Sequence, residues 1–186
     1  MKKFREFSES VLFVDSGLVT VGPDEITMLV DRVKRNKLGR VRLCAHRGTE
    51  DQLHEMFIAI RGNSYIRPHR HVGKSESFHV IDGAVDVVLF DSTGKITEIN
   101  SLAASGTGAN FYHRLSDPLF HTLLVKSEYL VIHEITNGPF QKDQTQYADW
   151  APEENDVAKS KEYMVFIQEQ VGNMNRDSAR SDGRVE

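Results

Sequence analysis

The sequence lacks the features of secreted and membrane-bound chains. Its 186 residues include a single cysteine, Cys44, so an intrachain disulfide is excluded and nothing indicates an oxidising compartment. No stretch approaches the roughly 20 apolar residues of a membrane span. Glu6, Glu9 and Asp15 interrupt the N-terminal segment before it reaches the apolar length of a signal peptide, roughly 7–15 residues. We therefore expect a cytoplasmic protein that does not bind membranes.

A basic excess is also missing. Lysine and arginine number 23 against 27 aspartate and glutamate residues, which gives a net charge of −4. Nucleic-acid binding usually requires a basic surface, so we expect no nucleic-acid partner. Hydrophobic residues make up 39% of the chain and charged residues 27%, as in globular proteins, and the length fits one domain. Cys44 lies in an apolar run and is expected to be a buried structural thiol.

Helical patterns are confined to the two ends of the chain. Pro23 opens a pattern that continues through Asn36, with acidic residues near its start and basic residues near its end. Short apolar runs at 11–14 and 18–21 precede it and are expected to be extended. A second amphipathic helix is predicted over 153–172. We assign residues 1–39 to N-terminal strands and a helix that pack on the main domain, 141–173 to a C-terminal loop and helix, and 174–186 to a flexible tail.

Between these ends, residues 40–140 consist of short β-rich runs separated by glycine, asparagine, aspartate and serine. No long helical pattern intervenes, and this spacing is typical of an all-β sandwich or barrel. The predicted strands are 40–45, 53–60, 63–68, 77–82, 84–90, 95–102, 110–115, 121–126 and 129–135.

The most informative motif is His69-Arg-His71 followed by Glu76. Residues two apart on a strand project from the same face, so both imidazoles can reach one ion. The intervening Val-Gly-Lys-Ser segment allows a turn, after which Glu76 can supply an oxygen ligand. Histidine with carboxylate suits a divalent transition metal such as Zn, Mn, Fe or Ni. The pattern therefore predicts a metal site made by His69, His71 and Glu76.

A fourth ligand is expected from a later strand. We select His121, because Leu123 and Val125 alternate with it and can face the same interior. His113 is the alternative.

Several other side chains are predicted to surround the ion. Strand alternation would place Tyr65 and Arg67 on the face of His69 and His71, where we expect them to act in catalysis. Arg67 would also bind an anionic substrate by a bidentate fork. The remaining predicted substrate-binding residues are Lys74, Arg42 and His46.

The segment from Gly62 to Gly83 resembles the first motif of the cupin superfamily, in which a glycine is followed by H-x-H, a glutamate and a second glycine. Around His121 the usual proline-glycine signature of the second motif is absent. A narrower similarity covers roughly residues 25–155 and points to the WbuC-type cupin-fold metalloproteins. Its residues include Ser64-Tyr-Ile-Arg-Pro-His-Arg-His, Lys74-Ser-Glu, Phe90-Asp-Ser-Thr-Gly, His121-Thr and Trp150-Ala-Pro-Glu. The resemblance implies an all-β, single-domain cupin, that is a double-stranded β-helix or jelly-roll barrel, with an N-terminal and a C-terminal helix.

The resemblance also implies a function in bacterial surface-polysaccharide metabolism. Together with the predicted site, it leads us to expect a metal-dependent enzyme for a small anionic or sugar-derived substrate, with isomerase or epimerase chemistry. An Fe-dependent dioxygenase is one alternative, and a non-catalytic sugar-binding or regulatory cupin is another. A homodimer in which residues 1–21 add a strand is also considered.

Overall fold

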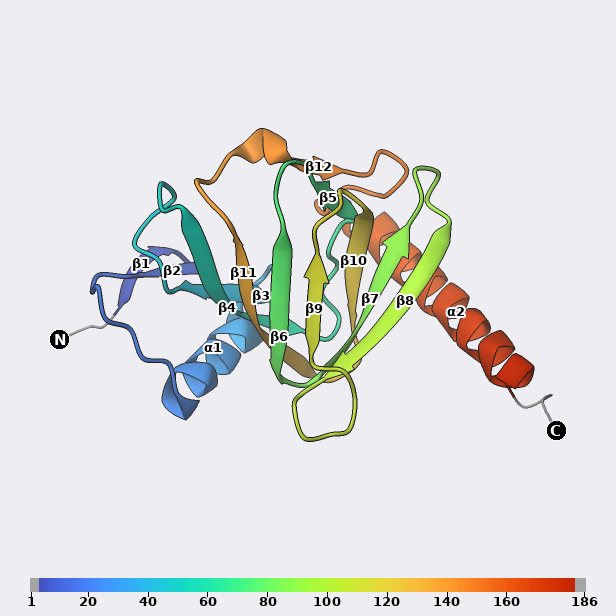
Figure 1. Cartoon of the computed structure of the whole chain (residues 1–186), viewed down its shortest axis with the longest axis horizontal. Helices are drawn as coiled ribbons and strands as arrows, with labels where there is room; N and C mark the ends of the chain where they lie inside the picture. The colour runs from blue at the N-terminus through green and yellow to red at the C-terminus, as the bar shows by residue number, and fades with distance from the viewer. Residues whose placement is uncertain (1–3, 183–186) are drawn as a thin grey trace.

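Two β-sheets face each other in the computed structural model, which describes residues 4–182 (Figure 1). The seven-stranded sheet has the spatial order β1 (Phe4–Ser8), β2 (Val11–Val14), β3 (Arg40–Cys44), β4 (Leu53–Arg61), β11 (Tyr129–Asn137), β6 (Glu76–Asp82) and β9 (Tyr112–Leu115). The five-stranded sheet has the order β12 (Thr145–Tyr147), β5 (His69–His71), β10 (Phe120–Val125), β7 (Ala84–Phe90) and β8 (Ile96–Ala103). The helices are α1 (Pro23–Arg35), α2 (Val157–Asp182) and the short 3-10 helix η1 (Lys142–Gln144).

The main core lies between the two sheets. Ile58, Phe78 and Ile132 from the larger sheet pack with Val87 and Leu123 from the smaller one, and all are buried. Burying such side chains stabilises the fold by roughly 1.5–3 kcal/mol each. This arrangement confirms the predicted single-domain, all-β jelly-roll barrel.

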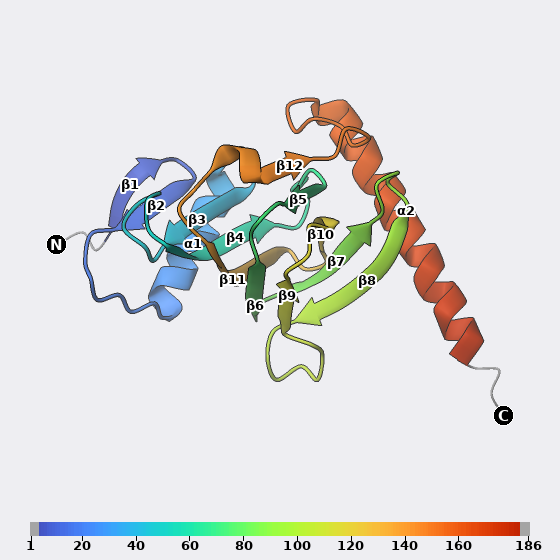
Figure 2. The same cartoon turned by 45° about the horizontal axis from the view of Figure 1, so that its top comes forward.

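The outer face of each sheet is covered by a helix (Figure 2). Leu29 and Val33 of α1 pack on Val41 and Val131 of the larger sheet. On the other side, α2 lies along the smaller sheet, where its Ile167 joins the outward residues of β7 and β10 in a second cluster. Strands buried on both faces are expected to be almost continuously apolar, which explains the run Ala-Val-Asp-Val-Val-Leu-Phe in β7.

Helix α1 begins as the sequence predicts. Pro23 occupies the first helical position, where its missing N–H is not required, and the Glu25 carboxylate accepts a hydrogen bond from the Gly22 N–H. The helix ends at Arg35, one residue before the predicted end.

Several predicted elements and boundaries differ from the structure. Residues 18–21 and 63–68 form no strand, whereas β1 lies at Phe4–Ser8 and pairs with β2. Strand β12 pairs with β5, so the barrel extends past the predicted boundary at residue 140. The C-terminal helix starts at Val157 and continues to Asp182, although we predicted a flexible tail over 174–186; residues 183–186 of that prediction lie outside the described residues.

Strand β1 lies at one edge of the larger sheet. The homodimer that its free edge could support stays a prediction. Among the described helices, none combines the length and apolarity needed to cross a membrane.

Candidate metal centre

Three imidazoles converge inside the barrel, on the inner side of the five-stranded sheet. His69 and His71 stand on β5, and His121 on β10 is directly opposite His69 in the strand register. One nitrogen from each ring lies within 4.8 Å of the corresponding nitrogens of the other two. We call these three residues the histidine cluster.

The second ring nitrogen of each histidine is held by the protein. His69 Nδ1 lies 2.9 Å from the Arg67 carbonyl oxygen, and His121 Nδ1 lies 3.1 Å from that of Leu119. His71 Nδ1 lies 3.3 Å from the hydroxyl of Thr145 on β12. A carbonyl can only accept, so Nδ1 of His69 and His121 must carry the proton, and Nε2 is the atom left to bind a metal.

Glu76 completes the group from the other sheet. One of its carboxylate oxygens lies 3.1 Å from His71 Nε2, and the other lies 3.5 Å from His121 Nε2. Burial alone would raise the pKa of Glu76, but the hydrogen bonds from His121 and His71 outweigh it and hold that pKa well below its ordinary value. The carboxylate thus places a negative charge where the histidine nitrogens meet.

The histidines respond in opposite ways to this environment. Burial, assisted by the neighbouring His121, lowers the pKa of His69 to about 3, so its imidazole is neutral at physiological pH. For His121, burial is outweighed by Glu76, which raises the pKa. A neutral imidazole is the form that binds metals, and an anionic carboxylate stabilises positive charge at the centre.

This donor set fits a divalent transition metal. Three Nε2 atoms and one carboxylate form a nitrogen-rich set with an anionic member, which suits Zn, Mn, Fe or Ni. The bonds to the Nδ1 atoms fix ring orientation, as outer-sphere partners do in metalloproteins. His69, His71, His121 and Glu76 are therefore the residues that would hold the ion.

A cavity of about 260 Å³ opens next to this centre, and His71 and Glu76 form part of its wall. The strand register explains which residues of the larger sheet face it. Thr136 pairs with both Glu76 and His54, and Glu134, two residues earlier on β11, pairs with Met56 and Phe78. Because side chains alternate along a strand, Thr136 and Glu134 point to the same side as Glu76.

Two cations line the cavity without forming an ion pair within residues 4–182. Arg42 on β3 reaches only the Met56 sulfur, 4.0 Å from its Nη1. Lys74, in the turn after β5, has its Nζ 5.8 Å from the centre of the Phe140 ring, and burial lowers the pKa of its ammonium group. His46 also lines the cavity; its ring stacks on that of His54 with the centroids 4.1 Å apart. Three of the four predicted substrate-binding residues, Arg42, His46 and Lys74, thus share one cavity.

Glu134 is a cavity residue that we did not predict. Burial first, and then the charge of Glu76, raise the pKa of its carboxyl to about 8, so it is mostly protonated at neutral pH. A sequence signal was present, because Glu134 continues the alternation of the inward-facing Leu130 and Ile132. A carboxyl in phase with core residues indicates a position that faces the barrel interior.

Tyr65 and Arg67 do not lie at this site. The prediction that they share a strand face with His69 and His71 is wrong. Regular strand begins only at His69, and before it Ile66, instead of its neighbours, points into the barrel core. The Tyr65 ring packs in the cluster beneath α2, and its hydroxyl donates to the Pro152 carbonyl at 2.9 Å. Arg67 donates to the Ala148 carbonyl at 2.8 Å and lies over the Tyr147 ring.

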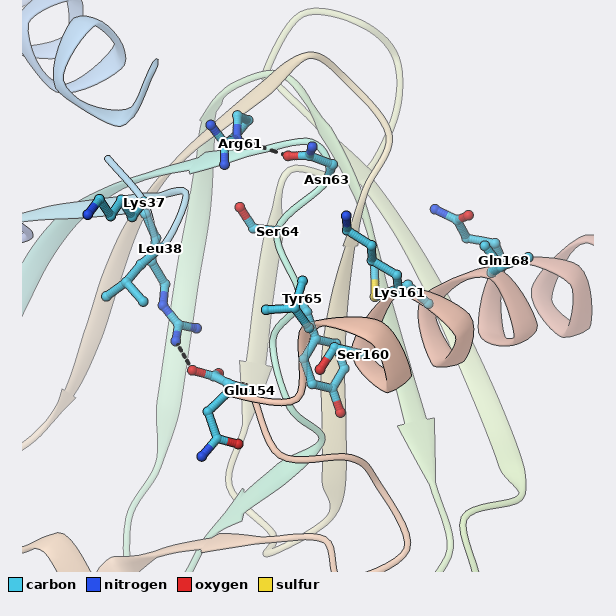
Figure 3. Close-up of a pocket in the computed structure, with 15 residues that line it drawn as sticks. Lys37, Leu38, Arg61, Asn63, Ser64, Tyr65, Glu154, Ser160, Lys161 and Gln168 are labelled. Carbon is cyan, nitrogen blue, oxygen red and sulfur yellow. Dashed lines mark hydrogen bonds and ion pairs between the residues drawn. The ribbon is translucent and has the colours of Figure 1, made fainter. Parts of the chain in front are cut away.

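Tyr65 lines a different and larger hollow, of about 790 Å³, between the first turns of α2 and residues 37–40 and 61–65 (Figure 3). Its central polar groups bond to one another. Arg40 pairs with Glu154, Arg61 donates to Asn63, and the Ser64 hydroxyl donates to the Gly39 carbonyl. The Arg40–Glu154 pair ties the segment before α2 to the barrel, and the hollow is lined by none of the candidate metal ligands.

The alternative fourth ligand, His113, lies on β9 beside Phe78 and outside the histidine cluster. Its Nε2 is buried and has no hydrogen-bond partner in the described part of the chain, and burial lowers the pKa of the ring. His79 faces away from Glu76 and packs against Tyr112.

The jelly-roll barrel places three histidines on one sheet and a glutamate on the other, and together they form a candidate metal centre. A family model described as a domain of unknown function, DUF6016, matches residues 22–102. No curated protein matches the chain.

Several solved structures are similar to part of the chain. A sugar phosphate isomerase of the cupin superfamily from Silicibacter pomeroyi is 14% identical, with a TM-score of 0.42, over 54% of this chain and 60% of its own. An oxalate oxidase in complex with the substrate analogue glycolate is 14% identical, with a TM-score of 0.45, over 56% and 54%. An oxalate decarboxylase variant from Bacillus subtilis is 16% identical, with a TM-score of 0.42, over 52% and 24%. The chain thus spans less than two thirds of the length of each of these proteins.

Proposed function

We propose that this protein is a divalent-metal-dependent enzyme that acts on a small anionic molecule, with isomerase or epimerase chemistry. One observation carries the proposal: three imidazoles, each with Nδ1 held by the protein, present Nε2 beside a buried carboxylate at the wall of a cavity. Arg42 and Lys74 line the same cavity without an ion pair among residues 4–182, which favours an anionic guest.

When bound, a divalent ion would supply Lewis-acid polarisation of a carbonyl or hydroxyl oxygen of the substrate. The chain's own residues orient that substrate. Arg42 offers a planar fork to a carboxylate or phosphate, and Lys74 contributes a second positive charge near the turn after β5. The protonated Glu134 carboxyl can donate a hydrogen bond to a substrate oxygen, and His46, which is nearly buried, can exchange a proton at the cavity wall.

Metal content tests the first half of the proposal. Protein purified without chelator is expected to contain about one transition-metal ion per chain by elemental analysis, and Glu76→Gln is expected to lose most of it because an anionic ligand becomes neutral. His79→Gln is the matched control, since His79 lies outside the barrel. A Glu76→Gln protein that retains the wild-type metal content would contradict the proposed centre.

Catalysis is tested by exchange with solvent. Isomerases and epimerases that remove a proton next to a carbonyl incorporate deuterium when the reaction runs in D2O. The metal-loaded protein is incubated with a panel of sugar phosphates and of 2-hydroxy and 2-oxo acids, and exchange is followed by NMR. We expect exchange in one class that stops on addition of chelator and in Glu76→Gln. Binding of panel members without exchange would instead support a non-catalytic binding protein.

The metal's identity separates the second candidate chemistry. Iron in the purified protein, with oxygen consumption in the presence of a panel member, would favour the dioxygenase; manganese, zinc or nickel would favour the isomerase. The WbuC-type assignment and the role in surface-polysaccharide metabolism stay predictions.

A further inference from the structure

The walls of the cavity divide into a charged part and an apolar part. The charged part is formed by Arg42 and Lys74, close to the candidate metal ligands. The apolar part comes from the N-terminal strands and the segment before η1, with Phe7, Phe13 and Phe140 as its aromatic members. A guest that satisfies both parts must carry a charge at one end and apolar surface at the other.

Two of these aromatic rings are exposed to water although they border the cavity. Phe7 is 68% exposed and Phe140 is 56% exposed. Phe7 meets Phe13 edge to face with ring centroids 5.7 Å apart, so the two rings form one apolar surface. Large exposed apolar groups beside a cavity indicate a place where a ligand covers them.

The hydroxyl groups that line the cavity, which could otherwise bind a sugar, are already engaged by the protein. Three threonines provide the only neutral hydroxyls among the described residues that line the cavity. Thr136 donates to the Ser75 carbonyl at 3.0 Å, the Thr145 hydroxyl lies 3.3 Å from His71 Nδ1, and Thr49 donates to Glu50 at 3.3 Å. A polyhydroxylated ring would lose its bonds to water on entry and would find no free hydroxyl in exchange, only the ionisable groups of the wall and the buried His54 Nε2, which has no partner among the described residues.

We propose that the cavity binds a 2-hydroxy or 2-oxo carboxylic acid with an aromatic-sized apolar side chain, in preference to a polyhydroxylated sugar. Arg42 takes the carboxylate, the 2-oxygen faces the histidine cluster, and the side chain lies against Phe7 and Phe140. This assignment rests on the proposed metal-dependent function, because the 2-oxygen is the atom that the ion would polarise. It deepens that function by naming the class of substrate.

Affinity for three probes tests the assignment. Lactate and 3-phenyllactate share the hydroxy acid and differ only in the phenyl ring, and glucose 6-phosphate represents an anionic sugar. Isothermal titration calorimetry is performed on cobalt-loaded protein, and again after chelator treatment. We expect 3-phenyllactate to bind at least about tenfold more tightly than lactate, because burying the ring against Phe7 and Phe140 removes apolar surface from water. Glucose 6-phosphate is expected to bind more weakly than 3-phenyllactate.

Substitutions test which part of the cavity binds the side chain of the acid and which part binds its carboxylate. Phe7→Ala and Phe140→Ala should reduce the advantage of 3-phenyllactate over lactate while leaving the affinity for lactate within about twofold. Arg42→Lys should weaken both acids by about tenfold, because the bidentate fork is lost. Phe111→Ala is the matched control: this ring is 44% exposed but packs near His79, away from the cavity.

The outcomes separate the two proposals. Equal affinity for lactate and 3-phenyllactate, or tighter binding of glucose 6-phosphate, overturns the proposed substrate class. If the same protein binds cobalt, the proposed metal centre still stands. Failure to bind cobalt, with cobalt content measured independently, overturns the metal centre. A preference for the phenyl ring that persists after chelator treatment would still support the apolar part of the cavity.

Discussion

Each imidazole of the histidine cluster depends on a neighbour that the ligand motif does not contain. The Arg67 and Leu119 carbonyls and the Thr145 hydroxyl hold the three Nδ1 atoms. Thr145 stands on β12, far along the chain from His71, so closing the barrel also orients a ligand. Such outer-sphere bonds typically change metal affinity by 10- to 100-fold when they are removed.

Cys44 is the subject of a prediction at this scale. It is 2% exposed, and burial raises the pKa of its thiol from 9.0 to about 11. At pH 8 we expect a thiol-specific chromogenic reagent to label the native protein slowly and the denatured protein at once, because the reactive thiolate is scarce in the fold. Because the buried site favours the neutral thiol, Cys44 contributes to the free energy of unfolding below pH 9. This stabilisation is lost as the pH rises towards about 11. Rapid labelling of the native protein at pH 8 would show that Cys44 is accessible.

The sequence could predict that the candidate metal ligands cluster, but not the whole candidate site. His69, His71 and Glu76 lie in one short segment. Once that segment is assigned to two strands joined by a turn, their spacing predicts that the three side chains converge. Tyr65 and Arg67 misled us because alternation holds only within a regular strand, and the chain changes phase between Ile66 and His69. Arg42 was among the predicted substrate-binding residues, but its approach to the cavity depends on β3 joining the larger sheet, which is a tertiary contact that the sequence does not show.

At the scale of elements, two glycines of the motif allow close packing between strands. A side chain at Gly62 would collide with the Ser127 carbonyl, and one at Gly83 would collide with the Tyr129 carbonyl. Gly83 also has a φ of +86°, a conformation that side chains disfavour. The segment that carries the ligands is therefore held against the turn before β11 at both ends.

Helix α2 gives a prediction about stability. Ile167 is 1% exposed and packs against the outward face of the smaller sheet. Ile167→Ala should lower the free energy of unfolding by about 2–5 kcal/mol, because it removes buried methyl groups and leaves a cavity. Val165→Ala, at a position that is 54% exposed, should change it by less than about 0.5 kcal/mol. Urea denaturation followed by circular dichroism measures both, and an equally small effect of Ile167→Ala would mean that α2 is not docked on the barrel.

Most strands and both helices followed from the sequence, since periodicity and turn residues are local signals. The exceptions have identifiable causes. Residues 63–68 have strand-like composition but do not pair with a neighbouring strand. Instead, the Ile66 carbonyl accepts a hydrogen bond from the Thr122 hydroxyl, and the Arg67 N–H donates to the Glu154 carboxylate. Strand β1 was missed because its residues are mostly exposed and its pattern carries little apolar alternation.

For the molecule as a whole, a bound ion would link the two sheets, because His69, His71 and His121 belong to the smaller sheet and Glu76 to the larger. A ligand that binds only the folded state stabilises it by about 2.7 kcal/mol at a hundredfold excess over Kd. We therefore expect a saturating metal to raise Tm by roughly 5–10 °C. Differential scanning calorimetry should show this rise in wild type and in His79→Gln but not in Glu76→Gln. A Tm that does not respond to any transition metal would argue against the centre.

The apolar wall of the cavity and the candidate metal ligands come from different segments of the chain, which has an evolutionary consequence. The rings of Phe7 and Phe13 come from β1 and β2, whereas three of the candidate metal ligands, His69, His71 and Glu76, lie within the segment 22–102 that the domain model matches. Replacing or lengthening the N-terminal strands would change which substrate the cavity binds and would leave the candidate metal ligands unchanged. A lineage that keeps the barrel could therefore diversify its substrates through a segment that carries none of the metal ligands.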